Sequence, residues 1–297
     1  PHQFGGINHP LLYTQIIVSP KGDALLLDFA KKLVENENLG QDAITDYLAI
    51  SFSGVDAVNH FFGPSSLENE DMVLQLDKTL KSLFEFIDKK VGMDNTLIVL
   101  SADHGMAEMP EYMNEKGMEV GRIYSTDIID ITNRIGADSF GIDSIAKTFF
   151  RPSLYLKKDL IQRAGLDASH VANVIATELS KVTGIAVALS KDQIQSPSKD
   201  PIHIKIKNNF NEQRSGDIYV AQAPYWFLFE KGPIGVMHGS PWEYDTHVPI
   251  IFSGPDIDHK SINQLVHPAD LAPTLSAYLG IPAPESSSGK VLTEIKN

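Results

Sequence analysis

Residues 95–105 read NTLIVLSADHG, an apolar run that ends in an acid, an imidazole and a glycine. A short continuous apolar run of this kind is typical of a strand that is buried on both faces of a sheet. Residues 46–52, DYLAISF, repeat the pattern and are soon followed by Asp56 and His60. We therefore predict two buried strands of one sheet, each followed at its carboxyl end by polar side chains.

Helical periodicity fills the segments around these two strands. Residues 23–36 place apolar side chains at helical spacing and reach a natural stop at Gly40. Residues 65–92 carry one long apolar stripe and open with a capping-box pattern from Ser65 to Glu68. This alternation of helix and strand predicts an α/β fold, with a doubly wound, mostly parallel sheet and helices on both of its faces.

The pattern changes between residues 122 and 226. Short strand-like pieces surround one amphipathic helix near residues 169–182, and this order is typical of a small α+β unit. The strand-like pieces are SLYLK (153–157), GIAVALS (184–190), HIKIK (203–207) and GDIYVAQAP (216–224).

The first pattern returns after this insert. Residues 248–257 form an apolar strand pattern, and a helical pattern follows at residues 267–281. We therefore predict an α/β core made of residues 1–121 and 227–297, interrupted by an inserted α+β subdomain at 122–226. The chain opens with PHQFGGINHP, which is neither an initiator methionine nor a signal peptide. We expect a fragment of a longer protein in which the N-terminal part of the fold is absent.

The amino-acid composition excludes some classes of binding partner. The chain has 297 residues and a net charge of −13, which would repel nucleic acid and anionic membranes. Small anionic substrates stay possible, because bound cations can reverse the local field. No apolar stretch approaches the roughly 20 residues that span a bilayer, so we expect no membrane insertion. The absence of cysteine excludes disulfides and thiolate ligands.

Three polar clusters lie at or near the ends of predicted strands, where α/β sheets bind their ligands. Asp56 and His60 are four residues apart and would share one face of a helix. Asp103 and His104 are adjacent, so they can converge only where the strand breaks at Gly105. The third cluster, MHGSPWEYDTH, runs from residue 237 to 247.

Each cluster alone has a simpler interpretation. An acid and a histidine four residues apart most often form a solvated helix face, and a lone histidine is more often hydrogen-bonded than a metal ligand. The coincidence of three such clusters at one edge of a sheet, in a chain without cysteine, is what favours metal. Carboxylates and imidazoles together suit a divalent ion such as zinc.

Five segments in a fixed order resemble the alkaline phosphatase superfamily, and within it the bacterial phosphate-irrepressible type of alkaline phosphatase. Single pieces such as DHG also recur in phosphodiesterases, phosphoglycerate mutases and sulfatases, but all five in this order are far more restrictive. The segments are residues 46–77, LSADHGM (100–106), RSGDIYVAQAPYW (214–226), HGSPWEYDTHVPIIFSGP (238–255) and DLAPTLSAYLGIP (270–282).

The resemblance implies two divalent metal ions, normally zinc. Asp56, His60 and one histidine of the third cluster would hold the first ion. Asp103 and His104 would hold the second, together with residues further upstream. We choose His238 for the third cluster, because the superfamily tends to place a His-Gly pair at this point, and His247 is the competing candidate.

The same resemblance implies a phosphomonoesterase that acts on a small phosphate ester in the periplasm or outside the cell. The family's nucleophile is a threonine or serine upstream of the segments found here. We therefore assign no catalytic residue and expect this fragment alone to be inactive. Ser101 and Thr246 lack a supporting motif, and the same holds for phosphate contacts by Arg122, Arg151 or Arg214.

Two alternatives stay open. A phosphodiesterase or nucleotide pyrophosphatase could use the same scaffold, and upstream phosphate-contacting residues would distinguish it. A metal-binding domain without catalysis, used for interaction, is the second alternative. The sequence does not indicate the oligomeric state.

Overall fold

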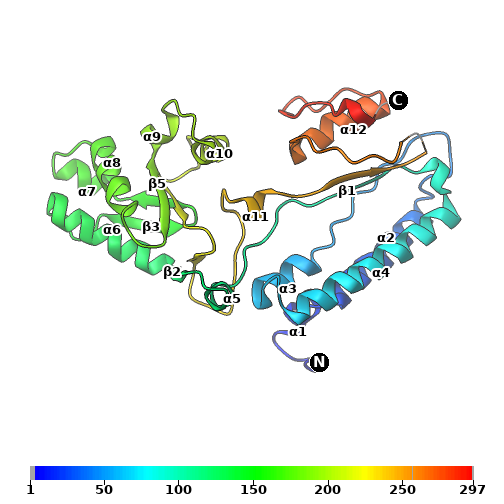
Figure 1. Ribbon diagram of the computed structural model, residues 1–297, viewed down its shortest axis with the longest axis horizontal. Coiled ribbons are helices and arrows are strands. Elements are labelled where there is room, and N and C mark those ends of the chain that lie inside the picture. The colour runs from blue at the N-terminus through cyan, green and yellow to red at the C-terminus, as the bar shows by residue number, and fades with distance from the viewer. Residues whose placement is uncertain (1–3, 256, 296–297) are drawn as a thin grey trace. The chain divides into compact units, whose positions relative to one another are not determined.

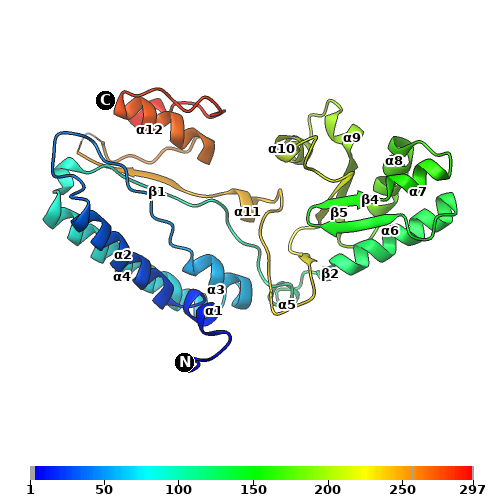
Figure 2. The same cartoon turned by 180° about the vertical axis from the view of Figure 1, so that it is seen from behind.

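The computed structural model describes residues 4–255 and 257–295 (Figures 1 and 2). Helices and strands mix along the chain, so the predicted α/β class is confirmed. The chain separates into two compact units. Unit 1 comprises the described parts of Pro1–Val58, Glu70–Gly105 and His247–Asn297, and unit 2 comprises Asn59–Asn69 and Met106–Thr246.

Two helices that lie mainly in unit 1 begin at side-chain caps. The hydroxyl of Ser19 accepts a hydrogen bond from the amide of Lys21 at the start of the second helix. The cap of the long fourth helix is Ser66, whose hydroxyl accepts from the amide of Asn69 at 3.1 Å. The predicted capping box at Ser65 is therefore wrong by one residue. The helices that lie wholly or mainly in unit 1 are α1 (Leu12–Ile17), α2 (Pro20–Asn36), α4 (Leu67–Lys90) and α12 (Leu271–Leu279).

Unit 1 contains one pair of strands among the described residues. β1 (Ile98–Ser101) pairs antiparallel with β8 (Ile250–Ser253), and Leu100 lies opposite Ile251. The strand predicted at residues 46–52 is wrong, because a strand needs a hydrogen-bonded neighbour and no described segment supplies one. For the same reason the mostly parallel sheet is not formed within the described residues.

Unit 2 is built on a four-stranded antiparallel sheet with the order β3-β4-β6-β5. α6 (Ser125–Phe140) packs against β3, α8 (Ala168–Leu179) packs against β5, and the two helices contact each other (Figure 1). Fully buried side chains from both helices and the sheet form the core of the unit. The strands are β3 (Ala146–Phe150), β4 (Ser153–Leu156), β5 (Ile185–Ser190) and β6 (Ile218–Gln222), and the core includes Ile128, Leu154, Val171, Ile175, Leu179, Ile218 and Val220.

One predicted strand of the insert is a helix. Residues 203–207, HIKIK, lie inside α10 (Pro201–Asn209). Asp200 caps this helix by accepting a hydrogen bond from the amide of Ile202 at 2.9 Å, and Pro201 occupies its first turn. These local signals outweigh the alternation of isoleucine and lysine that had indicated a strand.

The remaining elements of unit 2 are short. β2 (Arg122–Tyr124) and β7 (Phe227–Phe229) form a parallel pair. The other helices are α5 (Pro110–Glu115), α7 (Lys158–Arg163), α9 (Lys191–Gln195) and α11 (Glu243–Thr246). The sequence-based division at 121/122 and 226/227 stays a prediction. No helix in the described part of the chain is both long and apolar enough to cross a membrane.

Two adjacent phenylalanines of β3 test this packing. Phe149 is 5% exposed and Phe150 is 73% exposed. We expect Phe149→Ala to lower the free energy of unfolding by about 3–5 kcal/mol, because it leaves a cavity in the core. Phe150→Ala should change it by about 0.5 kcal/mol or less. Both tryptophans lie in unit 2, so urea unfolding followed by tryptophan fluorescence measures this unit. Equal effects of the two variants would contradict the packing.

Candidate metal site

The helix that carries the first two candidate ligands is fixed at its start. α3 (Gly54–Phe62) places Asp56 and His60 one turn apart. The amide of Gly54 donates a 3.1 Å hydrogen bond to Oδ1 of the buried Asp23. A Cβ at position 54 would collide with Cε of Met72 and lie 2.8 Å from Oδ2 of Asp23, so a larger residue would have to displace both side chains. The contact with Asp23 therefore fixes the start of α3, which carries the candidate ligands Asp56 and His60.

His60 is tied to the backbone of residues 235–236. Its Nδ1 lies 2.9 Å from the carbonyl oxygen of Val236. Its own carbonyl accepts from the amide of Gly235 at 2.7 Å and from that of Val236 at 3.3 Å. Because a carbonyl only accepts, Nδ1 carries the proton and Nε2 is the unprotonated nitrogen, the form that can bind a metal. A metal-bound histidine commonly makes this kind of contact through its other nitrogen.

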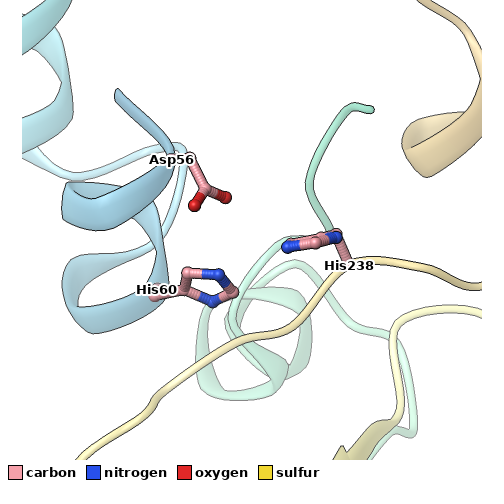
Figure 3. Close-up of side chains that lie close together, drawn as sticks. All are labelled: Asp56, His60 and His238. Atoms are coloured by element: carbon pink, nitrogen blue, oxygen red, sulfur yellow. The ribbon is translucent and has the colours of Figure 1, made fainter. Parts of the chain in front are cut away.

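The third candidate ligand, His238, lies two residues beyond Val236. The rings of His60 and His238 are 5.0 Å apart between centroids and inclined by 44°. Figure 3 shows the carboxylate of Asp56 and both imidazoles turned toward a common space. Each of the three residues offers one ligand atom, and these atoms all lie within 4.8 Å of one another.

This donor set fits a zinc ion. Bonds of about 2.0–2.2 Å place two ligands of one zinc ion at most about 4.4 Å apart. Small side-chain rotations therefore bring the three atoms to that spacing. One carboxylate and two imidazoles are also the ligand types that zinc accepts in sites without cysteine. Asp56, His60 and His238 are all partly buried, which leaves the space open to a substrate.

The structure also places the second predicted pair near Asp56. Nε2 of His104 lies 3.5 Å from Oδ2 of Asp103 and 3.9 Å from Oδ1 of Asp56. Nδ1 of His104 lies 3.0 Å from the carbonyl of Gly105, so its Nε2 is also the unprotonated nitrogen. The side chain of Asp103 is 89% exposed. Asp103 and His104 therefore lie beside the three-residue group without belonging to it.

His247, the competing candidate, is exposed and is not part of the three-residue group. Ser101 and Thr246, which lacked a motif, are engaged elsewhere. The hydroxyl of Ser101 donates to the carbonyl of Pro249 at 2.9 Å, and that of Thr246 accepts from Lys205 at 3.0 Å.

Sequence reasoning missed the role of two arginines in unit 2. Nη1 of Arg122 donates to the carbonyl of Gly235 at 2.7 Å, and the same guanidinium makes two hydrogen bonds to Glu111. Nη2 of Arg151 donates to the carbonyl of His238. Both arginines thus hold the backbone that carries His238. Local sequence pattern could not predict these contacts, because each arginine binds a backbone carbonyl that is distant in the sequence.

The chain was compared with known proteins. Residues 19–241 match the family model of the type I phosphodiesterase / nucleotide pyrophosphatase family. The alkaline phosphatase PafA of Elizabethkingia meningoseptica is 34% identical over 282 residues, which are 94% of this chain and 51% of that protein. The alkaline phosphatase PhoV of Synechococcus elongatus is 34% identical over 284 residues, 95% of this chain and 51% of that one.

The chain is also similar to a solved structure of one of these relatives. The crystal structure of wild-type alkaline phosphatase PafA matches with a TM-score of 0.87 at 33% identity, over 96% of this chain and 54% of that one. The fold is therefore that of PafA across nearly all of the residues compared. The chain spans about half the length of the relatives that it matches.

The carboxylate of Asp23, which accepts from the first amide of α3, should make the stability of the fold depend on pH. Burial raises the pKa of Asp23, and the hydrogen bond from Gly54 opposes this rise. A raised pKa means that the unfolded chain loses this proton at a lower pH than the folded chain. Stability is therefore greatest below the unfolded pKa and falls as the pH rises through the folded pKa. Asp23→Asn removes this dependence.

We expect the difference in unfolding free energy between Asp23→Asn and the unchanged chain to shift in favour of the variant between pH 4 and pH 7. Urea unfolding followed by far-UV circular dichroism at several pH values measures it. Asp28, another acid of α2, provides the control substitution, Asp28→Asn. A difference that stays constant with pH would show that Asp23 is not the buried carboxylate described.

Proposed function

Because the chain belongs to the type I phosphodiesterase / nucleotide pyrophosphatase family, we propose that this protein is a metal-dependent hydrolase of phosphate esters. The observation that carries the proposal is the convergence of Asp56, His60 and His238, three metal-ligand types, on one space. Relatives named alkaline phosphatases support it, since two of them match over nearly all of this chain.

The proposed centre holds two divalent ions, with zinc in both positions. Asp56, His60 and His238 hold the first ion. Asp103 and His104 contribute to the second, which the approach of His104 to Asp56 supports because it brings the two sets of donors side by side. Metal pairs in phosphoryl-transfer enzymes stand about 3.5–4 Å apart, so neighbouring donor sets are what such a pair requires.

The chain's own residues prepare this chemistry. When bound, the ions supply Lewis acidity and lower the pKa of an attacking hydroxyl or water. Val236 holds the proton of His60 on Nδ1, and Gly105 does the same for His104. Both imidazoles thus present Nε2. The acids of the site lie in a chain of net charge −13, so bound cations are needed before an anionic phosphate ester can approach.

The preferred substrate is a small phosphomonoester. The relatives named alkaline phosphatases support this choice, whereas the name of the matching family favours a phosphodiester or nucleotide pyrophosphate as the second candidate. We assign the nucleophile to no residue of this chain. A periplasmic or secreted location belongs to the same proposal and rests on the family resemblance alone.

Metal content tests the proposed ligands directly. We expect Asp56→Ala, His60→Ala and His238→Ala each to lower bound zinc by about one ion per chain, because removing one ligand from a three-ligand site leaves too few donors. Elemental analysis after dialysis against zinc gives the count. His247→Ala is the matched control, since this exposed histidine lies outside the group, and it should leave the count unchanged. Unchanged zinc in the first three variants would remove those residues from the ligand set.

The substrate class needs the full-length protein with its metals. We expect its kcat/KM for an aryl phosphate monoester to exceed that for the matching methyl aryl diester. The physical reason is that a monoester presents three unsubstituted phosphoryl oxygens to the bound cations, whereas a diester presents two and carries less negative charge. A clear preference for the diester would replace the monoesterase by the phosphodiesterase, and no hydrolysis of either substrate would favour a metal-binding domain without catalysis.

A further inference from the structure

Two charged side chains from outside the turn at residues 238–240 form hydrogen bonds with it. Arg151 donates to the carbonyl of His238 through Nη2. Asp245 accepts from both the amide of Ser240, at 2.8 Å, and the hydroxyl of Ser240, at 2.6 Å. Gly239 lies between the two held residues and has a φ of +89°, a conformation that favours glycine. The backbone on both sides of the turn is therefore fixed by side chains outside it.

Arg151 is partly buried and Asp245 is buried. Asp245 is 3% exposed. Burial lowers the pKa of Arg151, while the negative charge of Asp245 opposes this fall. A buried charge is costly unless it is paired and hydrogen-bonded. The described contacts of these two side chains include the hydrogen bonds to the backbone of residues 238–240.

The same segment is held at its other end. Arg122 donates to the carbonyl of Gly235, and His60 bonds to the backbone of Gly235 and Val236. Arg151 takes the next held carbonyl along the chain, that of His238 itself. Beyond the turn, Lys205 donates to the carbonyl of Pro241 and the indole of Trp242 donates to the carbonyl of Gln222, each at 2.9 Å. Arg151 and Asp245 hold the backbone between these two sets of contacts, and without them the His238 imidazole could turn away from Asp56 and His60.

We propose that Arg151 and Asp245 are positioning residues, which hold the turn at 238–240 so that the His238 imidazole faces Asp56 and His60 before any metal binds. The inference rests on the proposed metal site for its role in binding. It assigns Arg151 to the backbone of the turn, because its guanidinium donates to the carbonyl of His238.

A double-mutant cycle with zinc tests the proposal on the full chain. Arg151→Met keeps the length of the side chain and removes its donors. We expect it to weaken zinc binding about 10- to 100-fold, the usual effect of losing a residue that orients a ligand. In a His238→Ala background the same change should cost less than about threefold, because the residue being oriented is gone. Arg151→Lys keeps the charge and a donor, so it should recover part of the affinity.

Folding and a matched arginine serve as controls. Arg163→Met removes an exposed arginine of unit 2, which pairs with Asp159 at 2.6 Å, and should leave zinc affinity unchanged. Tryptophan fluorescence in urea reports whether each variant is folded. Arg151→Met leaves Asp245 buried without its partner, so the neutral double variant Arg151→Met/Asp245→Asn provides a second test if the single variant does not fold. Equal losses with and without His238 would overturn the proposal.

A readout without metal separates this proposal from the metal site. In the metal-free chain, hydrogen exchange of the Ser240 amide should be at least about tenfold faster in Arg151→Met than in Arg163→Met, because the turn opens more often. Unchanged protection of that amide would overturn the positioning role. Zinc binding that is indifferent to His238→Ala would instead overturn the metal site, and the exchange result would still decide the role of Arg151.

Discussion

The hydrogen bonds between His60 and the backbone of residues 235–236 are the constraint on which the site depends. They involve both the ring and the main chain of His60, so they fix the helix and the imidazole together. They also bring His238 beside His60, although 178 positions separate the two residues in the chain. Without them, Asp56 and His60 would be an ordinary polar pair on a helix face.

Much of the secondary structure could be predicted from local pattern. The helix around residues 169–182 and the strands at 153–156, 185–190 and 218–222 follow from periodicity and burial. Two failures have physical reasons. Residues 46–52 look like a strand, but pairing depends on a distant neighbour that periodicity cannot reveal. Residues 203–207 alternate like a strand, yet Asp200 and Pro201 start a helix there.

The residues of the candidate site likewise fall into those that local sequence pattern could predict and those that it could not. Asp56 and His60 could be predicted from the sequence as a pair, because side chains on one face of a helix recur at a fixed spacing. The choice of His238 over His247 needed the family resemblance, since both lie in one short polar cluster. In the structure His238 lies two residues beyond the carbonyl that contacts His60 and belongs to the three-residue group, whereas His247 does not. Arg151 and Asp245 gave no signal, because a bond from a side chain to a remote backbone atom leaves no pattern in sequence.

The proposed metal site has one ion shared by Asp56, His60 and His238. Anomalous diffraction at the zinc edge from a zinc-loaded crystal locates that ion. We expect a peak with one oxygen of Asp56 and one ring nitrogen of each histidine at about 2.0–2.2 Å. A peak bound to Asp56 and His60 with His238 turned away, or a peak at His247 instead, would contradict it.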